Sequence, residues 1–341
     1  MTRLIDRIWE RDGLGAAALT PLSWLFGVAV AARNLAYDRG VLSSHALGLP
    51  AVSVGNLSVG GTGKTPVAAW VAQELTRRGA TPAILLRGHG DDEPLVHERL
   101  TPGVIVVADP DRVAGAHRAL GAGATVLVLD DAFQHRRARR DLDIVLVAAE
   151  QGMARRLLPA GPLREGARAL RRAQLLVVTR KTASAADAVD TAARWSAASP
   201  GLPSVRVHLA ADALLPVTAD LPTAGAGALA ALAGRRVLAI SAIGAPAAFE
   251  GQLRSAGAKV ESAAYPDHHA FTDVQIAELA LRATRADIAV CTLKDAVKLE
   301  GRWPRQAPPL WYVSQLVVIE QGERILANLL DRLVRPVPSV T

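Results

Sequence analysis

"SVGGTGKTP", residues 58–66, is the most informative stretch of this 341-residue chain. It follows the phosphate-binding pattern G-x-x-x-x-G-K-[ST] except at the first position, where Ser58 replaces glycine. Three later glycines still let backbone N–H groups turn toward an anion, and Pro66 falls in the first helical turn, where its missing N–H costs little. The residues that we expect to hold a nucleotide are Ser58, Val59, Gly60, Gly61, Thr62, Gly63, Lys64 and Thr65.

The flanking residues give this stretch the context that a phosphate loop requires. Residues 51–57, "AVSVGNL", predict a short buried strand, and residues 65–79 have helical spacing. A loop between a strand and a helix directs the positive end of the helix toward phosphate groups. We therefore expect Lys64 to contact the β- and γ-phosphates and the Thr65 hydroxyl to bind Mg²⁺.

The rest of the chain predicts an α/β fold. Further apolar runs predict strands at residues 82–88, 103–109, 124–131, 142–149 and 173–180, with helical segments between them. This alternation is typical of a parallel sheet covered by helices on both faces. The pattern weakens over residues 181–235, which we interpret as a connector rich in Ala, Gly and Pro. It returns with strands at residues 235–241, 258–265, 286–293 and 309–319 and a last helix over 320–334.

We therefore predict three parts: an N-terminal region over residues 1–45, a P-loop NTPase-like core over 46–195 and a smaller C-terminal α/β domain over 196–341. In the first part, residues 13–32 carry no charge and are long enough to cross a bilayer. Their Ala and Gly content makes them only modestly hydrophobic. This apolar helix could lie in a membrane interface, cross a membrane once or be buried in the protein.

Composition limits the partners of the chain. The net charge of +7 favours anionic partners, which include phosphorylated substrates, acidic lipids and nucleic acid. The basic run "HRRARR", residues 135–140, lacks interleaved aromatic residues, so we expect no nucleic-acid binding. Cys291 is the single cysteine, which excludes an intrachain disulfide, and its apolar neighbours predict a buried thiol.

Three further stretches bring acidic and imidazole groups to loops. "TVLVLDD" ends a strand with Asp130 and Asp131, a position from which a carboxylate can hold Mg²⁺. "RGHGDDEPL" carries Asp91, Asp92 and Glu93, and "YPDHHAFT" carries Asp267, His268 and His269. Phosphoryl transfer to an alcohol needs a carboxylate or imidazole to accept the hydroxyl proton, and cations around the transferred group.

The nucleotide and the reaction are less directly specified. The chain lacks the N-K-x-D motif of guanine-binding proteins, so ATP is the expected nucleotide. Val59 occupies the position of a second lysine that partitioning ATPases carry, which argues against their dimeric mechanism. From these residues alone, a kinase, a soluble P-loop ATP-dependent ligase or synthetase, and a nucleotide-switched membrane module all remain open.

"NLSVGGTGKTP", "RGHG…DEP", "DDAFQH", "LPAGPLRE" and "DHHAF" occur in that order, and with them the chain resembles the tetraacyldisaccharide 4'-kinases of lipid A biosynthesis. The likeness extends from the N-terminal apolar segment to residue 299. It implies a two-domain kinase that uses ATP and Mg²⁺ to phosphorylate the 4'-hydroxyl of an acylated glucosamine disaccharide 1-phosphate. It also implies a place at the anionic cytoplasmic face of the inner membrane, peripheral or anchored by residues 13–32. No obligatory protein partner is expected.

The resemblance also implies roles for individual residues. Asp92 would be the general base, with Asp91 as the alternative, and His268 would orient the Asp92 carboxylate. Lys64 would be the third catalytic residue. Residues implied at the metal are Thr65, Asp130, Asp131 and Glu93, and either acid of the Asp130–Asp131 pair could be the Mg²⁺ ligand. Residues implied near phosphate or substrate are Arg112, Gln134, His135 and Arg164. The chain departs from the family pattern at His89, Ala132 and Leu293, and in the short interval between Gly90 and Asp92.

Overall fold

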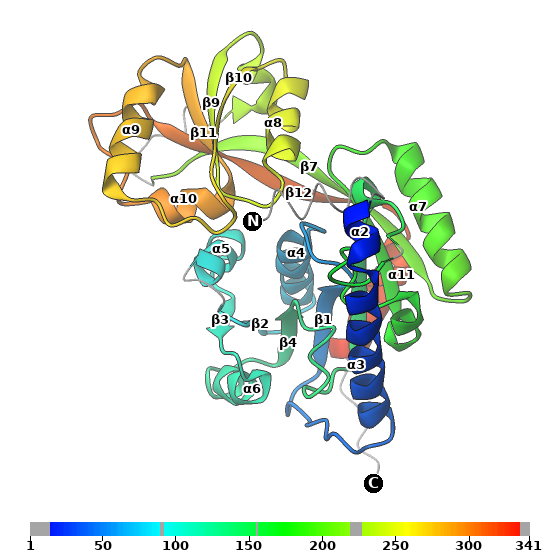
Figure 1. Ribbon diagram of the computed structural model, residues 1–341. Coiled ribbons are helices and arrows are strands. Elements are labelled where there is room, and N and C mark those ends of the chain that lie inside the picture. Colours follow the sequence, from blue (N-terminus) through cyan, green and yellow to red (C-terminus); the bar gives the residue numbers. More distant parts are fainter. Residues whose placement is uncertain (1–13, 89–91, 155, 219–226, 335–341) are drawn as a thin grey trace.

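The computed structural model describes residues 14–88, 92–154, 156–218 and 227–334. Within these residues the strands form one sheet in the order β10-β9-β11-β12-β7-β6-β5-β1-β4-β2-β3, with β8 paired to β7 (Figure 1). The strands are β1 Ala51–Asn56, β2 Pro82–Leu86, β3 Ile105–Ala108, β4 Val126–Asp130, β5 Leu142–Ala148, β6 Leu175–Arg180, β7 Ser204–Pro216, β8 Gly227–Ala228, β9 Arg236–Ser241, β10 Lys259–Ala264, β11 Ile288–Cys291 and β12 Leu310–Gln321. The α-helices are α2 Leu14–Ala18, α3 Thr20–Asp38, α4 Lys64–Arg77, α5 Asp92–Leu100, α6 Arg112–Gly121, α7 Ala185–Ala198, α8 Pro246–Ser255, α9 Asp273–Ala283, α10 Leu293–Leu299 and α11 Glu323–Val334. Short 3₁₀ helices are η1 Ala149–Gln151, η2 Ala167–Arg172 and η4 Leu229–Leu232.

The predicted P-loop NTPase-like α/β fold is confirmed. Strands β1 to β6 are parallel to their neighbours, and the apolar runs bury both faces of the sheet. On one face, Val52 and Val54 of β1 join the core formed with α4 and α11. On the other face, Leu176 and Val178 of β6 join the core formed with α7 and η2. Alternate residues of each strand therefore face opposite helical layers, which explains the continuous apolar runs.

The interval that we interpreted as a connector holds α7 and the long strand β7, followed by the short β8 and η4. In β7 the buried side chains of Val205, Val207 and Leu209 alternate with Arg206 and His208. This period of two is the signature of a half-buried strand. The interpretation as a connector was wrong because the Ala, Gly and Pro content of the following residues hid this short alternation.

Strands β7 and β12 connect the two domains. They pair antiparallel from Arg206 opposite Gln321 to Pro216 opposite Trp311. The beginning of β7 also pairs with β6 of the first domain, and the beginning of β12 pairs with β11 of the second. The sheet is therefore continuous through this two-stranded ribbon, with the second domain built on its far end (Figure 1).

The last helix returns to the first domain. Leu326, Leu330 and Leu333 of α11 belong to the same buried cluster as Val67 and Val71 of α4. The division into residues 1–45, 46–195 and 196–341 stays a prediction. Its second boundary falls within α7, and α11 contributes to the core of the first domain.

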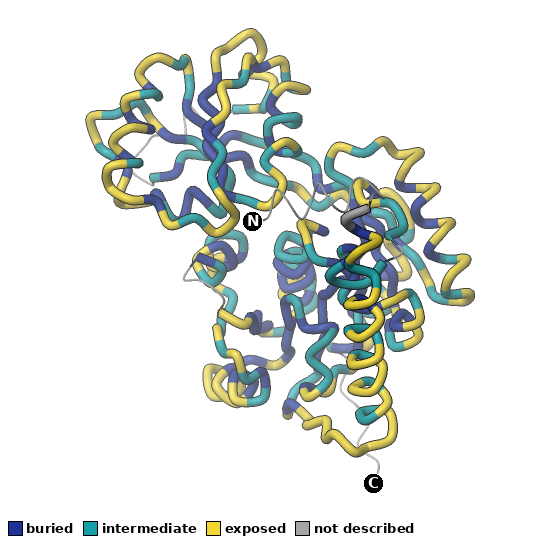
Figure 2. Tube along the Cα trace, viewed as in Figure 1, coloured by how far each residue is buried: buried dark blue, intermediate teal, exposed yellow. Residues whose placement is uncertain are grey.

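The N-terminal apolar segment forms α2 and α3, with residue 13 outside the described part. On its inner side, the Ser23 hydroxyl donates a hydrogen bond to the Leu157 carbonyl at 2.9 Å, and Asn34 Nδ2 donates one to Glu165 Oε2 at 2.9 Å. On the outer side, Leu22, Trp24, Leu25 and Val28 are between 53% and 73% exposed (Figure 2). Among the described helices, none has the length and hydrophobicity needed to cross a membrane.

Candidate active site

The phosphate loop is held in shape by side chains from neighbouring strands. Asn56 Nδ2 donates to the Thr62 hydroxyl at 3.0 Å, and the Thr179 hydroxyl donates to the Thr62 carbonyl at 2.9 Å. The Ser58 hydroxyl donates to Gln151 Oε1 at 2.9 Å. Ser58 therefore has a structural partner of its own, which explains how the loop tolerates a residue other than glycine at its first position.

Gly63 is needed for the close approach of the loop to the sheet. Its φ of 82° lies in the left-handed region, and it precedes the first residue of α4. A Cβ atom added at Gly63 would lie 2.2 Å from Leu209 Cδ1. This position therefore excludes larger residues both by conformation and by space.

Lys64, Asp131 and Arg164 meet at the mouth of the loop. Lys64 Nζ lies 3.6 Å from Asp131 Oδ1, and Arg164 Nη1 contacts both carboxylate oxygens of Asp131 at 3.0 and 3.1 Å. Burial lowers the pKa of Lys64, and the nearby Asp131 opposes that shift. A partly buried lysine and an arginine held by one carboxylate form a positive site suited to phosphate oxygens.

Asp130 lies deeper, at the end of β4. His97 Nε2 of α5 lies 2.9 Å from Asp130 Oδ2, while Oδ1 is buried and has no hydrogen-bond partner among the described residues. Burial favours the neutral form of Asp130, but the hydrogen bond from His97 and the charges of His97 and Lys64 outweigh it and lower its pKa. An ionised carboxylate with one free oxygen beside the phosphate loop has the chemistry of a Mg²⁺ ligand.

The described residues contain no group of three or more His, Cys, Asp or Glu side chains able to hold a metal ion by themselves. This agrees with the habit of Mg²⁺ in nucleotide sites, where one or two carboxylates act together with phosphate oxygens and water. Glu93 of α5 is near Asp130: burial and then the Asp130 charge raise its pKa. A bound cation would relieve this repulsion. The residues present therefore fit Mg²⁺.

Asp92 is the first residue of α5 and connects the two domains. Its buried Oδ2 lies 3.6 Å from His268 Nδ1 and 3.2 Å from Lys298 Nζ. Asp92 belongs to the first domain, whereas the other two residues belong to the second. The predicted pair of Asp92 and His268 is therefore brought together. His269 instead contacts Gln275 at 2.9 Å, next to the N-cap of α9, and stacks on Tyr265.

Two of these residues have unusual backbone conformations. Asp131 has a φ of 52° and His268 a φ of 56°, and they are the two non-glycine residues with positive φ in the described chain. Such conformations cost energy and tend to cluster at functional sites. The replacement of the usual glycine by Ala132 is tolerated because the positive φ falls on Asp131, one residue earlier.

The remaining predicted residues line the same edge of the sheet. Arg112 is buried, and its Nη2 donates to the Asp130 carbonyl at 3.3 Å. Gln134 Nε2 donates to the Asn56 carbonyl at 2.8 Å, so it braces the strand before the phosphate loop. Burial, followed by the charges of Arg112 and Arg140, lowers the pKa of His135 to about 4, which makes it neutral near pH 7. His89, Gly90 and Asp91 lie outside the described residues.

Four residues of this site were not predicted from the sequence: His97, Lys181, Lys294 and Lys298. The charge of Lys294 acts on Lys64, Glu93 and Asp130. Lys181 Nζ donates to the Gly61 carbonyl at 2.9 Å. Signals existed for the other three. Glu93 and His97 are four apart on α5, and Lys294 and Lys298 are four apart on α10, so each pair shares a helix face. These two helices lie against each other at the domain boundary.

Comparison with known proteins identifies the family. The family model described as tetraacyldisaccharide-1-P 4'-kinase matches residues 15–92 and 90–335. The tetraacyldisaccharide 4'-kinase of Anaeromyxobacter sp. strain K is 41% identical over 98% of this chain and 96% of that protein, and that of Chlorobium limicola is 32% identical over 93% and 97%. The solved "apo" form of LpxK from Aquifex aeolicus in complex with ATP has a TM-score of 0.72 and 30% identity, covering 94% of this chain and 99% of that one. The chain belongs to the tetraacyldisaccharide 4'-kinase family.

Proposed function

We propose that this chain transfers the γ-phosphoryl group of ATP to the 4'-hydroxyl of an acylated glucosamine disaccharide 1-phosphate, a precursor of lipid A. The observation that carries the proposal is the juxtaposition of Asp92 and His268 across the domain boundary, 3.6 Å apart, beside a complete phosphate loop. A nucleotide switch needs the loop but has no use for a carboxylate–imidazole pair. Membership of the kinase family supports the same reaction.

In this proposal the residues of the first domain hold the nucleotide. Lys64 and Arg164 contact phosphate oxygens as charge moves during transfer. Thr65 and Asp130 would hold Mg²⁺, which supplies charge neutralisation at the β- and γ-phosphates when bound. Asp130 is the better ligand of the acid pair because one of its oxygens is free, whereas both oxygens of Asp131 contact Arg164. Glu93 would assist at the same cation.

The proton of the acceptor hydroxyl is taken up by Asp92, which pairs with His268 across the boundary between the two domains. Asp92 accepts it as the 4'-oxygen attacks, and His268, whose Nδ1 lies 3.6 Å from Asp92 Oδ2, orients the carboxylate. The positively charged Lys298 lies 3.2 Å from the same oxygen and fixes its place. Arg112, Gln134 and His135 support the edge of the sheet around the transferred group.

The test is an assay with γ-labelled ATP and the acylated disaccharide 1-phosphate in detergent. Transfer of label to the lipid is expected. A folded protein that binds ATP but transfers no label would exclude the kinase reaction. A soluble ligase or synthetase would instead leave the label on inorganic phosphate in the presence of its own substrates.

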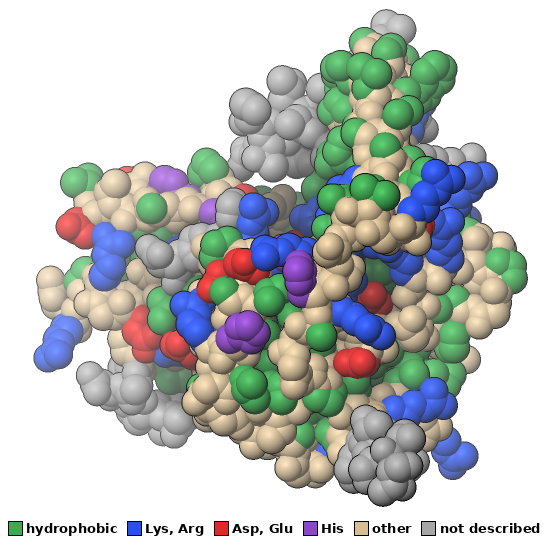
Figure 3. Space-filling model, turned by 90° about the horizontal axis from the view of Figure 1, so that it is seen from below, with side chains coloured by type: hydrophobic (Ala, Val, Ile, Leu, Met, Phe, Trp, Pro, Cys, Tyr) green, Lys and Arg blue, Asp and Glu red, His purple; other side chains and the backbone are tan. Residues whose placement is uncertain are grey.

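The outer face of α3 supports binding to the membrane surface where such a lipid resides. In Figure 3, hydrophobic side chains gather along the helix that projects at the top of the view, and Lys and Arg side chains lie near its base. Trp24, Leu25 and Val28 are each at least 68% exposed, and Arg33 and Arg39 are exposed at the end of the helix. An apolar face bordered by arginines is suited to an anionic interface, here the cytoplasmic face of the inner membrane.

Combined substitution of Trp24, Leu25 and Val28 by Ser should remove this binding. Flotation with vesicles containing anionic lipid should recover wild-type protein with the vesicles and leave the variant behind. Val274→Ser with Leu281→Ser on α9 is the matched control, since both residues are exposed apolar side chains of another helix. Equal flotation of the α3 variant and the control would contradict the proposal.

A further inference from the structure

Asp295 is a buried carboxylate for which the proposed chemistry has no direct use. It is the third residue of α10, and its side chain is fully buried. Its Oδ2 accepts hydrogen bonds from the Thr292 hydroxyl at 2.6 Å and from the Ala242 N–H at 3.0 Å. Its Oδ1 lies 3.8 Å from Lys298 Nζ. Burial raises the pKa of Asp295 and these contacts oppose the rise, so the contacts indicate why the fold keeps an acid in this place.

The same position in two other helices shows what an ordinary helix cap does. Asp187 and Gln275 are the third residues of α7 and α9, and each side chain accepts a hydrogen bond at 3.0 Å from the backbone N–H of the residue that caps its helix. In the described part of the chain, Asp295 does not make this return bond. Its carboxylate turns inward instead, toward Ala242 and Lys298. Helix capping alone therefore does not explain its orientation.

Both inward contacts of Asp295 lead to a residue that holds Asp92. Lys298 Nζ lies between the two carboxylates, 3.2 Å from Asp92 Oδ2 and 3.8 Å from Asp295 Oδ1. Ala242, directly after β9, donates its N–H to Asp295 and accepts the His268 N–H at its carbonyl, at 3.2 Å. The backbone of His268 has a φ of 56°, a conformation that persists only where its surroundings fix it. The two second-domain partners of Asp92 therefore share one anchor.

Charge, and not a directed hydrogen bond, holds Lys298 in this arrangement. Among the described residues, Lys298 Nζ, Asp92 Oδ2 and Asp295 Oδ1 are all buried and have no hydrogen-bond partner. Buried charges interact more strongly than exposed ones because little water screens them. An ammonium placed between two carboxylates is drawn toward both, so loss of the charge on Asp295 would let Lys298 move toward Asp92.

We propose that Asp295 is a positioning residue for the transfer reaction. Its charge fixes Lys298, and its hydrogen bond to the Ala242 peptide fixes the loop that carries His268. Through these two residues it holds the Asp92 carboxylate where the acceptor hydroxyl needs it. The inference rests on the proposed function, in which Asp92 accepts the proton of that hydroxyl.

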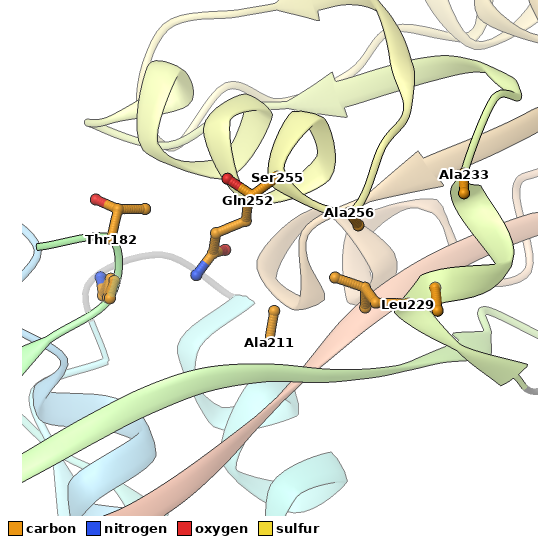
Figure 4. A pocket seen from close by; sticks show the side chains of 9 residues that line it. Thr182, Ala211, Leu229, Ala233, Gln252, Ser255 and Ala256 are labelled. Atoms are coloured by element: carbon orange, nitrogen blue, oxygen red, sulfur yellow. The ribbon is translucent and has the colours of Figure 1, made fainter. Parts of the chain in front are cut away.

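The surroundings of Asp295 are closed, in contrast to the cavity of about 550 Å³ between α8 and β7 (Figure 4). Gln252 and Ser255 of α8 and Ala211 of β7 line that cavity, and none of the residues that contact Asp295 does so. A substitution at Asp295 therefore leaves the lining of the cavity unaltered. An effect on turnover would report on the contacts of Asp295 itself.

Asp295→Asn separates charge from shape, because the amide oxygen can still accept from Thr292 and Ala242 while the charge beside Lys298 is lost. In the assay with γ-labelled ATP and the acylated disaccharide 1-phosphate, kcat should fall by about five- to tenfold, and the Kd for ATP should stay within about twofold of wild type. Asp187→Asn, the exposed acid at the third position of α7, is the matched control. It should leave kcat within about twofold, because a surface cap affects stability and not the site.

The decisive measurement is a double-mutant cycle with Lys298→Met. If Asp295 acts through Lys298, the double variant with Asp295→Asn should have the kcat of Lys298→Met alone, within about twofold. A residue that only stabilises the second domain would lower kcat by the same factor in both backgrounds. Asp295→Ala also removes the bond to Ala242, so it should be slower than Asp295→Asn through displacement of His268.

A wild-type kcat in Asp295→Asn would overturn the inference, and so would the same fold-loss in both backgrounds of the cycle. Equal kcat values for Asp295→Ala and Asp295→Asn would overturn the part that concerns His268. The cycle with Asp295→Asn decides the inference even where Asp295→Ala does not fold. Failure of the proposed function would be distinct, since the wild-type protein itself would then transfer no label.

Discussion

The phosphate-loop half of the site is held by hydrogen bonds within one domain, whereas the acceptor half is held by contacts between two domains. In the phosphate-loop half, Asn56 and Thr179 both donate hydrogen bonds to Thr62, at 3.0 and 2.9 Å. Asp92 instead depends on His268 and Lys298, at 3.6 and 3.2 Å, both from the opposite domain. The nucleotide half is therefore organised before any ligand binds, and the acceptor half is complete only when the domains are correctly placed.

This difference predicts distinct failures for the two halves. A substitution in the first half should change nucleotide binding and turnover together. A substitution in the second should change turnover and leave nucleotide binding intact, because no cross-domain contact of Asp92 supports the loop. The following variants test that separation, from the largest expected effect to the smallest.

Lys64→Ala should reduce label transfer by about 10³-fold and also weaken ATP binding, because it removes a partly buried cation from the phosphate site. Measurement of kcat and of ATP affinity on the same preparation checks both effects. Lys259→Ala, an exposed lysine at the start of β10, is the control and should be neutral. Near-normal turnover in Lys64→Ala would refute the phosphate-loop assignment.

Asp92→Asn should reduce kcat by about 10²–10³-fold, the range expected for loss of a general base, with the Kd for ATP unchanged. The amide keeps the size of the side chain and removes its ability to accept the proton. His268→Gln should give a smaller loss, since it removes only the orienting partner. If Asp92→Asn were active while an Asp91→Asn variant was not, the base would be the neighbouring acid.

Lys298→Met should reduce kcat by about ten- to a hundredfold through misplacement of Asp92, again without an effect on ATP binding. Lys298→Arg, which restores the charge, should recover part of the loss. Arg302→Met is the control. Arg302 lies shortly after α10, and its guanidinium pairs with Asp273 and not with Asp92. A parallel loss of ATP affinity in Lys298→Met would break the proposed separation of the two halves.

His135 gives the smallest predicted effect, a pH dependence of stability. Burial, with the charges of Arg112 and Arg140, lowers its pKa from 6.5 to about 4 in the folded protein. Between these values the unfolded chain binds more protons, so the free energy of unfolding rises as pH increases from about 4 to 6.5. His135→Gln should make this rise shallower in urea denaturation at pH 4.5 and 7. Equal slopes for the two proteins would show that His135 does not titrate in this way.

The phosphate-loop half could be predicted largely from sequence because its residues are contiguous. A strand, three glycines, Lys64 and Thr65 specify one local geometry, and the place of the acid pair at the end of β4 follows from parallel-sheet topology. The acceptor half could be proposed only through the family resemblance. Asp92 and His268 are far apart in the sequence, on α5 and in the loop after β10, and no local pattern encodes their 3.6 Å separation.

Residues that act through charge across the boundary were missed for the same reason. Lys298 is one of two lysines on α10, and only the packing of α10 against α5 gives it Asp92 as a partner. Strand β7 was not predicted because its regular alternation of buried and partly exposed side chains is confined to its first residues, 204–209. The overall class of fold depends on many residues and was predicted correctly, whereas single contacts depend on the path of the chain between them.

The return of α11 to the first domain has a consequence for biosynthesis. Leu326, Leu330 and Leu333 complete a core whose other fully buried members all precede residue 210 in the chain. The whole second domain therefore leaves the ribosome before the kinase core can close, and it can fold on the end of the ribbon while its host is still incomplete. A nascent chain stopped before residue 323 would contain every proposed active-site residue and still lack α11, whose leucines complete the hydrophobic core of the first domain.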